Sequence, residues 1–248
     1  MREKTLAIIQ ARMASIRLPG KVLMQIQGKP ILWYLVERLK RARMISEMII
    51  ATSSEVTDEP IVAFCQYNNL KVFRGSESDV LSRYAEAASL FDSQIIIRIC
   101  ADSPLLDPVI IDDFVIEFLS SNKKYDYLSN TINQTYPLGM NVEIFTKTAL
   151  EEANVLAKYK YEREHVTPYI YNNPLRYRIC QKHLQEDFSK IRLTVDVVED
   201  FNLIKLLIEH FHSQITNLGL DEILSFYVSC PDVFKINSHI KQKMLKSD

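Results

Sequence analysis

The chain has 248 residues, 47% of them hydrophobic and 25% charged, with a formal net charge of −1 at pH 7. These values are typical of a globular protein and exclude a disordered, collagen-like or wholly coiled-coil chain. The near-zero charge argues against a non-specific nucleic-acid binder, which needs a broad excess of positive charge. We therefore expect a single domain over residues 1–248 and no nucleic-acid partner.

The 4 cysteines and 5 histidines form no CxxC pair, no HExxH motif and no Cys/His cluster. Neither a zinc site nor a disulfide scaffold is therefore expected, and a reducing compartment fits best. No apolar run approaches the roughly 18 residues that a membrane span needs, and the apolar run near the start is too short for a signal peptide. We expect a cytoplasmic protein without a membrane partner.

The first 120 residues alternate between two hydrophobic periods. Short apolar runs predict buried strands at 5–10, 47–52, 71–74 and 94–99, and the 3.6-residue period predicts helices at 30–44, 58–68, 79–91 and 108–119. We expect Thr57 or Asp58, Ser78 and Asp107 to cap the last three helices. Alternating strands and helices predict a Rossmann-like, mostly parallel α/β sheet, with functional residues in the loops after residues 10, 52, 74 and 99.

The pattern changes from about residue 122. Strands are predicted at 125–129, 141–145, 175–180 and 190–194, interrupted by helices at 147–157 and 163–172 and followed by helices at 200–212 and 220–227. We interpret 122–190 as a small mixed extension of the sheet. Its many tyrosines favour a homodimer interface, because tyrosine is enriched at such surfaces. Alternatively, these rings only line a pocket and the local core.

The loop after the first predicted strand is rich in cations. Residues 10–21 read QARMASIRLPGK, with Arg12, Arg17 and Lys21 beside Ser15. The loop matches neither GxxxxGK[ST] nor GxGxxG. Three cations at the end of a buried strand suit a triphosphate, because arginine pairs with phosphate oxygens and lysine adds a point charge. A solvated basic loop is the alternative, and the charges alone do not separate the two.

This loop is similar to the N-terminal signature of the cytidylyltransferases that make CMP-activated acidic sugars, of the acylneuraminate and 3-deoxy-octulosonate types. It resembles most closely the spore coat polysaccharide biosynthesis branch of that family. Matching segments follow in order at GKPIL (28–32), FRGSESDVLSRY (73–84), RICADSPLLDP (98–108), REHVTPY (163–169) and RLTVDVVED (192–200). The resemblance implies the nucleotide-diphospho-sugar transferase fold.

The implied reaction is nucleotidyl transfer, in which a hydroxyl of a sugar acid or related polysaccharide precursor attacks the α-phosphorus of CTP and pyrophosphate leaves. The resemblance also implies Mg²⁺ held by Asp102 and Asp196, each of which follows a predicted strand. Mg²⁺ prefers one or two carboxylates together with phosphates and waters. Alternatively, Asp102 is a loop or helix-capping carboxylate. Asp107, Glu199 and Asp200 are favoured as carboxylates at helix N-termini.

The resemblance assigns catalytic roles to Arg12, Lys21 and Asp102. It assigns nucleotide binding to Ala11, Arg12, Ser15, Arg17, Lys21, Thr52, Arg74, Gly75, Ser76 and Asp79. Two of these assignments have simple alternatives. Thr52 and its neighbours could cap the next helix, and Asp79 could form a surface pair with Arg83, four residues along a helix.

Acceptor binding is assigned to Tyr136, Gly139, Glu143 and His165. His165 could instead be a structural hydrogen-bonding residue. The segment 136–143 departs from the family pattern, since Leu138 and Asn141 stand where the family often has acidic residues. This departure leaves the identity of the acceptor sugar open.

Two other functions remain open. The first is a glycosyltransferase on the same fold, but the chain has no D-x-D triplet, and Asp112-Asp113 lies within a predicted helix. The second is a non-catalytic nucleotide-binding module. The presence of Arg12, Lys21, Asp102 and Asp196 weighs against it.

Overall fold

The computed structural model describes residues 3–120 and 124–242, so the start of the predicted extension at 122–123 lies outside the described residues. Its main sheet has seven strands in the order β5-β4-β1-β6-β8-β7-β9. Their bounds are β5 (Val72–Gly75), β4 (Glu47–Ser53), β1 (Thr5–Gln10), β6 (Ile95–Cys100), β8 (Glu143–Thr146), β7 (Tyr127–Ser129) and β9 (Ile179–Gln181). The first four are parallel, whereas β8 runs antiparallel to both β6 and β7. The predicted mostly parallel α/β sheet with a mixed extension is confirmed.

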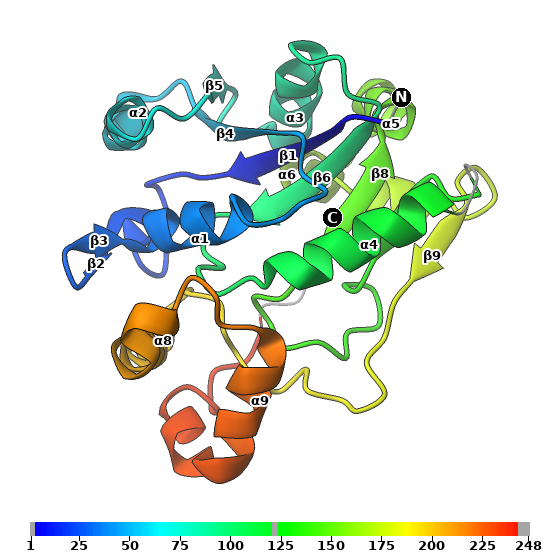
Figure 1. The fold of residues 1–248 in the computed structure, drawn as a ribbon. Helices are drawn as coiled ribbons and strands as arrows, with labels where there is room; N and C mark the ends of the chain where they lie inside the picture. Colours follow the sequence, from blue (N-terminus) through cyan, green and yellow to red (C-terminus); the bar gives the residue numbers. More distant parts are fainter. Residues whose placement is uncertain (1–2, 121–123, 243–248) are drawn as a thin grey trace.

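Helices cover both faces of this sheet (Figure 1). One face packs against α1 (Ile31–Leu39), α2 (Glu59–Tyr67) and α4 (Pro108–Ser120), and this core continues into α8 (Val198–Phe211) and α9 (Leu220–Ser229). The other face packs against α3 (Val80–Ser89), α5 (Lys147–Leu156) and α7 (Pro168–Tyr171). In β1, Ala7 and Ile9 enter the first core and Leu6 and Ile8 the second, because successive side chains point to opposite faces. A strand buried on both sides therefore reads as one apolar run.

The helix predicted at 163–172 is two helices, α6 (Lys160–His165) and α7, with a break at Val166. Val166 has a φ of +73° and a ψ of −56°, and the Thr167 N–H donates to the His165 carbonyl at 2.9 Å. These values define a strained γ-turn that β-branched residues rarely adopt. A helix cannot pass through such a backbone conformation, so the prediction of one continuous helix is wrong.

Further local predictions are wrong. The strand predicted at 175–180 is β9, over 179–181 only, and α2 has no side-chain cap at its N-terminus among the described residues. Residues 190–194 form no strand, only a single parallel bridge between Leu138 and Arg192. The cap of α3 is Asp79 rather than Ser78, because the Asp79 carboxylate accepts the Ser82 N–H at 3.0 Å. Asp107 does cap α4 as expected, since it accepts the Val109 N–H at 2.9 Å.

A small hairpin that the sequence analysis missed links the basic loop to α1. It consists of β2 (Gln25–Ile26) and β3 (Lys29–Pro30), joined by Gln27 and Gly28 with φ values of +49° and +74°. Two successive positive φ values are typical of the tight turns of two-residue hairpins. Helix α1 consequently begins at Ile31, after Pro30, and ends at Leu39. Within the described ranges, no helix is long and apolar enough to cross a membrane.

Candidate active site

Three segments that are distant in the sequence meet at the Lys21 ammonium. Its Nζ lies 2.6 Å from Oδ2 of Asp102 and 2.8 Å from Oδ1 of Asp196. Asp102 lies two residues after the end of β6. Its backbone carbonyl accepts the Val195 N–H at 2.8 Å, which holds the segment that leads to Asp196 against it. Lys21 enters from the predicted basic loop and begins a short 3₁₀ helix, η1 (Lys21–Leu23). Lys21, Asp102 and Asp196 are thus brought together, and the binding of triphosphate by Lys21 and of metal by the two aspartates stays a prediction.

Asp196 is held by two further cations. Its Oδ2 lies 3.0 Å from Arg17 and 3.5 Å from Arg192. Arg192 is also bound to Asp200 by two hydrogen bonds, of 3.0 and 2.8 Å, and the buried Asp200 accepts the Asp196 N–H at 3.0 Å. Asp200 lies in the first turn of α8, as expected. Its hydrogen bonds also hold the backbone of Asp196 and the arginine that pairs with Asp196.

The two aspartates differ in their electrostatic surroundings. Asp196 contacts three cations, and its side chain is 13% exposed, whereas Asp102 has Lys21 as its ion-pair partner in the described chain and is 23% exposed. Burial alone would raise the pKa of Asp196, but Lys21, Arg17 and Arg192 outweigh it and lower this pKa. Burial would likewise lower the pKa of Lys21, but the two carboxylates raise it above its ordinary value. Both shifts favour the charged forms of Asp196 and Lys21 at neutral pH.

Gly139, one of the predicted acceptor residues, lies against the segment that leads to Asp196. It has a φ of +98°, and a Cβ atom there would be 2.6 Å from the Leu193 carbonyl. Only glycine permits this conformation and this close approach together. Tyr136 is buried, and its ring meets Phe114 edge-on at a centroid distance of 6.1 Å. Gly139 and Tyr136 thus pack around the segment that leads to Asp196 and around α4, respectively. Contact of either residue with an acceptor stays a prediction.

Glu143 lies in a buried polar network on the face of the sheet that packs against α3, α5 and α7. Its carboxylate forms an ion pair with Arg98, the residue opposite it in β6, and accepts the hydroxyls of Tyr127 at 2.6 Å and Thr167 at 2.5 Å. Thr167 follows the γ-turn at Val166, and the half-buried His165 precedes it. The structure therefore brings Glu143 close to the 165–167 segment, although sequence reasoning gave no sign of the Arg98 and Tyr127 contacts.

Asp58 organises the loops at the ends of β1 and β4. Its buried carboxylate accepts the Met13 N–H at 2.7 Å, the Thr52 hydroxyl at 2.8 Å, and both the N–H (3.0 Å) and the hydroxyl (2.6 Å) of Ser53. The sequence analysis proposed Asp58 only as a helix cap. Thr52 and Ser53 at the end of β4 could have indicated this role, because buried hydroxyl groups need a hydrogen-bond acceptor nearby. In this state the Thr52 hydroxyl is bound to Asp58.

Replacing Asp58 by asparagine should destabilise the fold by about 2 kcal/mol at pH 7, because the amide nitrogen would face donors that the carboxylate now accepts. Burial would raise the pKa of Asp58, but these hydrogen bonds lower it. The stabilisation is therefore complete above the unfolded pKa near 4 and is lost as the pH falls through the folded value. Urea unfolding at pH 7 and pH 3 should show a large difference between wild type and Asp58→Asn at pH 7 that shrinks at pH 3. The exposed Asp92→Asn should show neither effect.

The predicted second nucleotide loop is held by two ion pairs. Arg74 binds Glu59 at 2.5 Å and also donates to the carbonyls of Ser54 and Glu55 at 3.0 and 3.1 Å. Asp79, besides capping α3, is bound by Arg163 of α6, whose Nε lies 3.0 Å from both carboxylate oxygens. Arg74 and Asp79 thus fix the loop that contains Gly75 and Ser76, and a direct nucleotide contact of either remains a prediction.

Arg83 is a buried cation beneath this loop. Its Nη1 donates to the Ser76 carbonyl at 2.6 Å, while its buried Nε has no partner among the residues that the structure describes. Burial lowers the pKa of Arg83, and the positive charge of the nearby Arg12 lowers it further. A Cβ on Gly75 would lie 3.0 Å from Arg83 Cγ, so the loop backbone packs closely on this side chain. Arg83 thus supports the loop from below, through the Ser76 carbonyl and the contact with Gly75.

Ala11 and Ser15, also predicted to contact nucleotide, hold the basic loop in place through their backbone N–H groups. The buried Ala11 donates its N–H to the Ala51 carbonyl at 3.1 Å, and Ser15 donates its N–H to the Met13 carbonyl at 2.8 Å. These bonds tie the loop to β4 and fold it back on itself. The contacts of both residues with nucleotide stay predictions.

Comparison with known proteins decides the family. A family model described as cytidylyltransferase matches residues 6–242. The chain belongs to the cytidylyltransferase family. A solved cytidylyltransferase from Leptospira borgpetersenii is 32% identical, with a TM-score of 0.90, and the match covers 98% of this chain and 100% of that one.

Two curated relatives carry functional names. The spore coat polysaccharide biosynthesis protein SpsF of Bacillus subtilis is 35% identical over 82% of this chain and 85% of its own length. The 3-deoxy-manno-octulosonate cytidylyltransferase of Geotalea daltonii is 40% identical over 45% of this chain and 44% of its own. The resemblance that the motifs indicated is therefore confirmed at the level of the family.

The aspartates of this cytidylyltransferase suit a metal that also binds phosphate. No cluster of three or more Cys, His, Asp or Glu side chains that could hold a metal ion occurs in residues 3–120 and 124–242. Asp102 and Asp196 instead point oxygens at one shared cationic centre, now the Lys21 ammonium. Two carboxylates with further positions left for phosphates and waters match the ligand preference of Mg²⁺.

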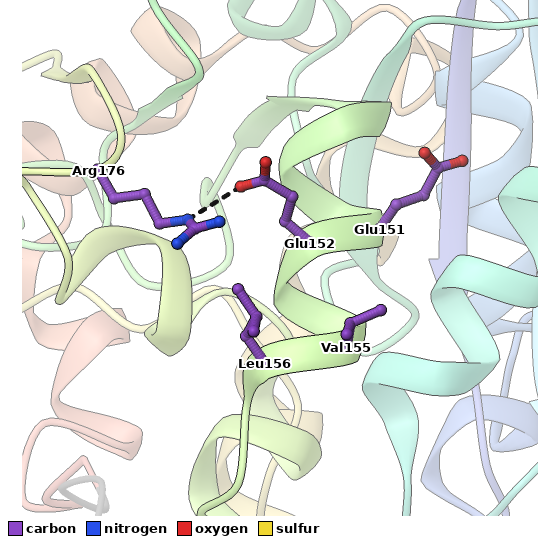
Figure 2. Close-up of a pocket in the computed structure, with 5 residues that line it drawn as sticks. All are labelled: Glu151, Glu152, Val155, Leu156 and Arg176. Carbon is purple, nitrogen blue, oxygen red and sulfur yellow. Dashed lines mark hydrogen bonds and ion pairs between the residues drawn. The ribbon is translucent and has the colours of Figure 1, made fainter.

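Of two surface cavities of the cytidylyltransferase, one lies apart from the Lys21 centre and the other borders Arg192, which contacts Asp196. A depression of about 360 Å³ on α5 is lined by Glu151, Glu152, Val155, Leu156 and Arg176, with Glu152 and Arg176 paired at 3.0 Å (Figure 2). It shares no residue with the site described above. A groove of about 470 Å³ lies beside Arg192 and is bordered by Leu138 and the C-terminal segment that contains Gln242.

Proposed function

We propose that this cytidylyltransferase moves CMP from CTP to a hydroxyl of a sugar acid or related surface-polysaccharide precursor and releases pyrophosphate. One observation carries the proposal: the basic loop and both predicted metal aspartates meet at Lys21, within 2.8 Å of its ammonium. Phosphoryl-transfer barriers are lowered mainly by positioning and by neutralising charge on phosphate oxygens. Cations and paired carboxylates converging at one point supply both.

Each part of the site has a proposed task. Arg12, Arg17 and Lys21 bind the triphosphate, and the closely packed loop at Gly75 and Ser76 receives the nucleoside. Asp102 and Asp196 would hold Mg²⁺, which when bound neutralises phosphate charge during transfer. Glu143 and His165 contact the acceptor. The name of the 3-deoxy-manno-octulosonate relative supports an acidic sugar as that acceptor, and the name of SpsF supports a polysaccharide precursor.

The test is a pyrophosphate-release screen of the four common nucleoside triphosphates against a panel of sugar acids, with Mg²⁺. The proposal expects release with CTP that depends on one of the acids. Release that is equally fast without any acceptor, or that prefers another triphosphate, would contradict it.

Truncating the basic loop should weaken CTP binding. Lys21→Ala and Arg12→Ala should each lose about 2–5 kcal/mol of binding free energy, because each removes a cation from the triphosphate. Arg17→Ala should lose less, because Arg17 is 38% exposed. Titration calorimetry with CTP measures these values, with the exposed Lys29→Ala as the matched control. Wild-type affinity in both Lys21→Ala and Arg12→Ala would mean that the loop is only a solvated basic surface.

The assembly and the location of the protein are proposed mainly from the sequence. The tyrosine-rich extension at 122–190 favours a homodimer, and the cysteine pattern favours the cytoplasm. The exposed Val155 and Leu175 lie in this extension and are candidates for a dimer contact.

A further inference from the structure

The Lys21 ammonium occupies the position that a metal shared by Asp102 and Asp196 would need. Nζ lies 2.6 and 2.8 Å from one oxygen of each carboxylate. A Mg²⁺ ion binds oxygen at about 2.0–2.1 Å and would have to lie at nearly the same point. The two cations therefore cannot be there at once, and binding of the metal requires that Lys21 leaves.

The charge count leads to the same conclusion. Asp102, Asp196 and Asp200 contribute three negative charges, and Lys21, Arg17 and Arg192 contribute three positive ones, so the cluster is neutral. A neutral, partly buried cluster offers a divalent cation little electrostatic gain. Without Lys21 and Arg17, the three carboxylates and Arg192 would carry a net charge of −2, which matches one divalent ion.

Both removable cations come from the loop that is proposed to bind the triphosphate. Lys21 and Arg17 lie within residues 10–21, whereas Arg192 stays bound to the buried Asp200 by two hydrogen bonds. A triphosphate carries more negative charge than either carboxylate, so it can attract the loop cations away from them. The same side chains would then bind phosphate and uncover the aspartates in one movement.

We infer that Lys21, assisted by Arg17, keeps the Asp102–Asp196 pair closed to divalent metal in the free enzyme. When a triphosphate binds, Lys21 and Arg17 leave the carboxylates and pair with the phosphates. The inference rests on the proposed function. Metal binding is then coupled to nucleotide binding, and the free enzyme has little affinity for divalent ions. Lys21 consequently has two successive partners, the aspartates in the free enzyme and phosphate in the complex.

The test measures Mn²⁺ binding by the full chain without nucleotide, from the electron paramagnetic resonance signal of free Mn²⁺. Lys21→Met should bind Mn²⁺ at least tenfold more tightly than wild type, and Arg17→Met about threefold. Lys29→Met, which removes an exposed lysine near the same loop, should match wild type. Asp102→Asn in the Lys21→Met background should abolish the gain, which would locate the bound ion.

Arg17→Met keeps the test decisive if Lys21→Met fails to fold, because Arg17 is partly exposed and its ion pair within the described residues is to Asp196. Mn²⁺ should also raise the melting temperature of a folded Lys21→Met more than that of wild type. Wild-type Mn²⁺ affinity in both variants would overturn the inference. CTP titration without metal in the same samples tests the proposed function separately. If the wild type does not bind CTP, the proposed function is contradicted, whatever the Mn²⁺ affinities show.

Discussion

Asp102→Asn should lower turnover about a thousandfold, equivalent to about 4 kcal/mol of transition-state stabilisation. Asparagine keeps the shape of the side chain but removes the anion that is proposed to hold the metal on the phosphates. The fold should persist, because the side chain is 23% exposed and the Asp102 backbone carbonyl retains its bond from Val195. Steady-state pyrophosphate release measures the effect, and circular dichroism checks the fold.

The matched control is Asp113→Asn, which removes an exposed carboxylate from α4 and should leave turnover unchanged. Asp196→Asn should behave like Asp102→Asn, because both carboxylates contact the same ammonium. Near-wild-type turnover of Asp102→Asn at low Mg²⁺ concentration would contradict the assignment of the metal pair.

Arg38→Met should lower the free energy of unfolding by about 3 kcal/mol, since several buried carbonyls lose a charged donor. Arg38 is fully buried in α1 and donates to the carbonyls of Leu105, Leu106, Ile215 and Leu218. It thereby joins α1, the loop after β6 and the chain before α9. Burial lowers its pKa to about 10, so it remains charged at neutral pH.

Urea denaturation followed by circular dichroism measures this loss. Arg41→Met is the control, because Arg41 is exposed and lies three residues further along. Its effect should stay within about 0.5 kcal/mol. Equal stability of the two variants would show that the buried carbonyls find other partners and that Arg38 is not a structural link.

The central part of the fold follows from local sequence patterns. An apolar run such as TLAIIQ at 5–10 is typical of a strand buried on both sides, and it forms β1. Because parallel strands end at one edge of the sheet, Lys21 and Asp102 could be placed near each other from the sequence. Asp196 was placed with them by the family resemblance and by a predicted strand at 190–194, which the structure reduces to a single bridge.

Other features depend on contacts between distant segments, which no local pattern encodes. The Arg98–Glu143 pair depends on the register of an antiparallel strand that returns 45 residues later. The break at Val166 overrides an apparently continuous helical period, and its packing against the second core fixes the turn. Asp58 has an ordinary capping position in the sequence, yet its carboxylate turns back toward Met13 and Ser53.

The fate of the α-phosphorus of CTP tests the proposed activity most directly. In ³¹P nuclear magnetic resonance of enzyme, CTP, Mg²⁺ and the sugar acid that supports pyrophosphate release, the α-phosphorus signal should move to a phosphodiester joining CMP to the sugar. Phosphodiester and pyrophosphate should form in equal amounts. Free CMP without any phosphodiester would mean that water, not a sugar, is the acceptor and would contradict the transfer of CMP to a sugar acid.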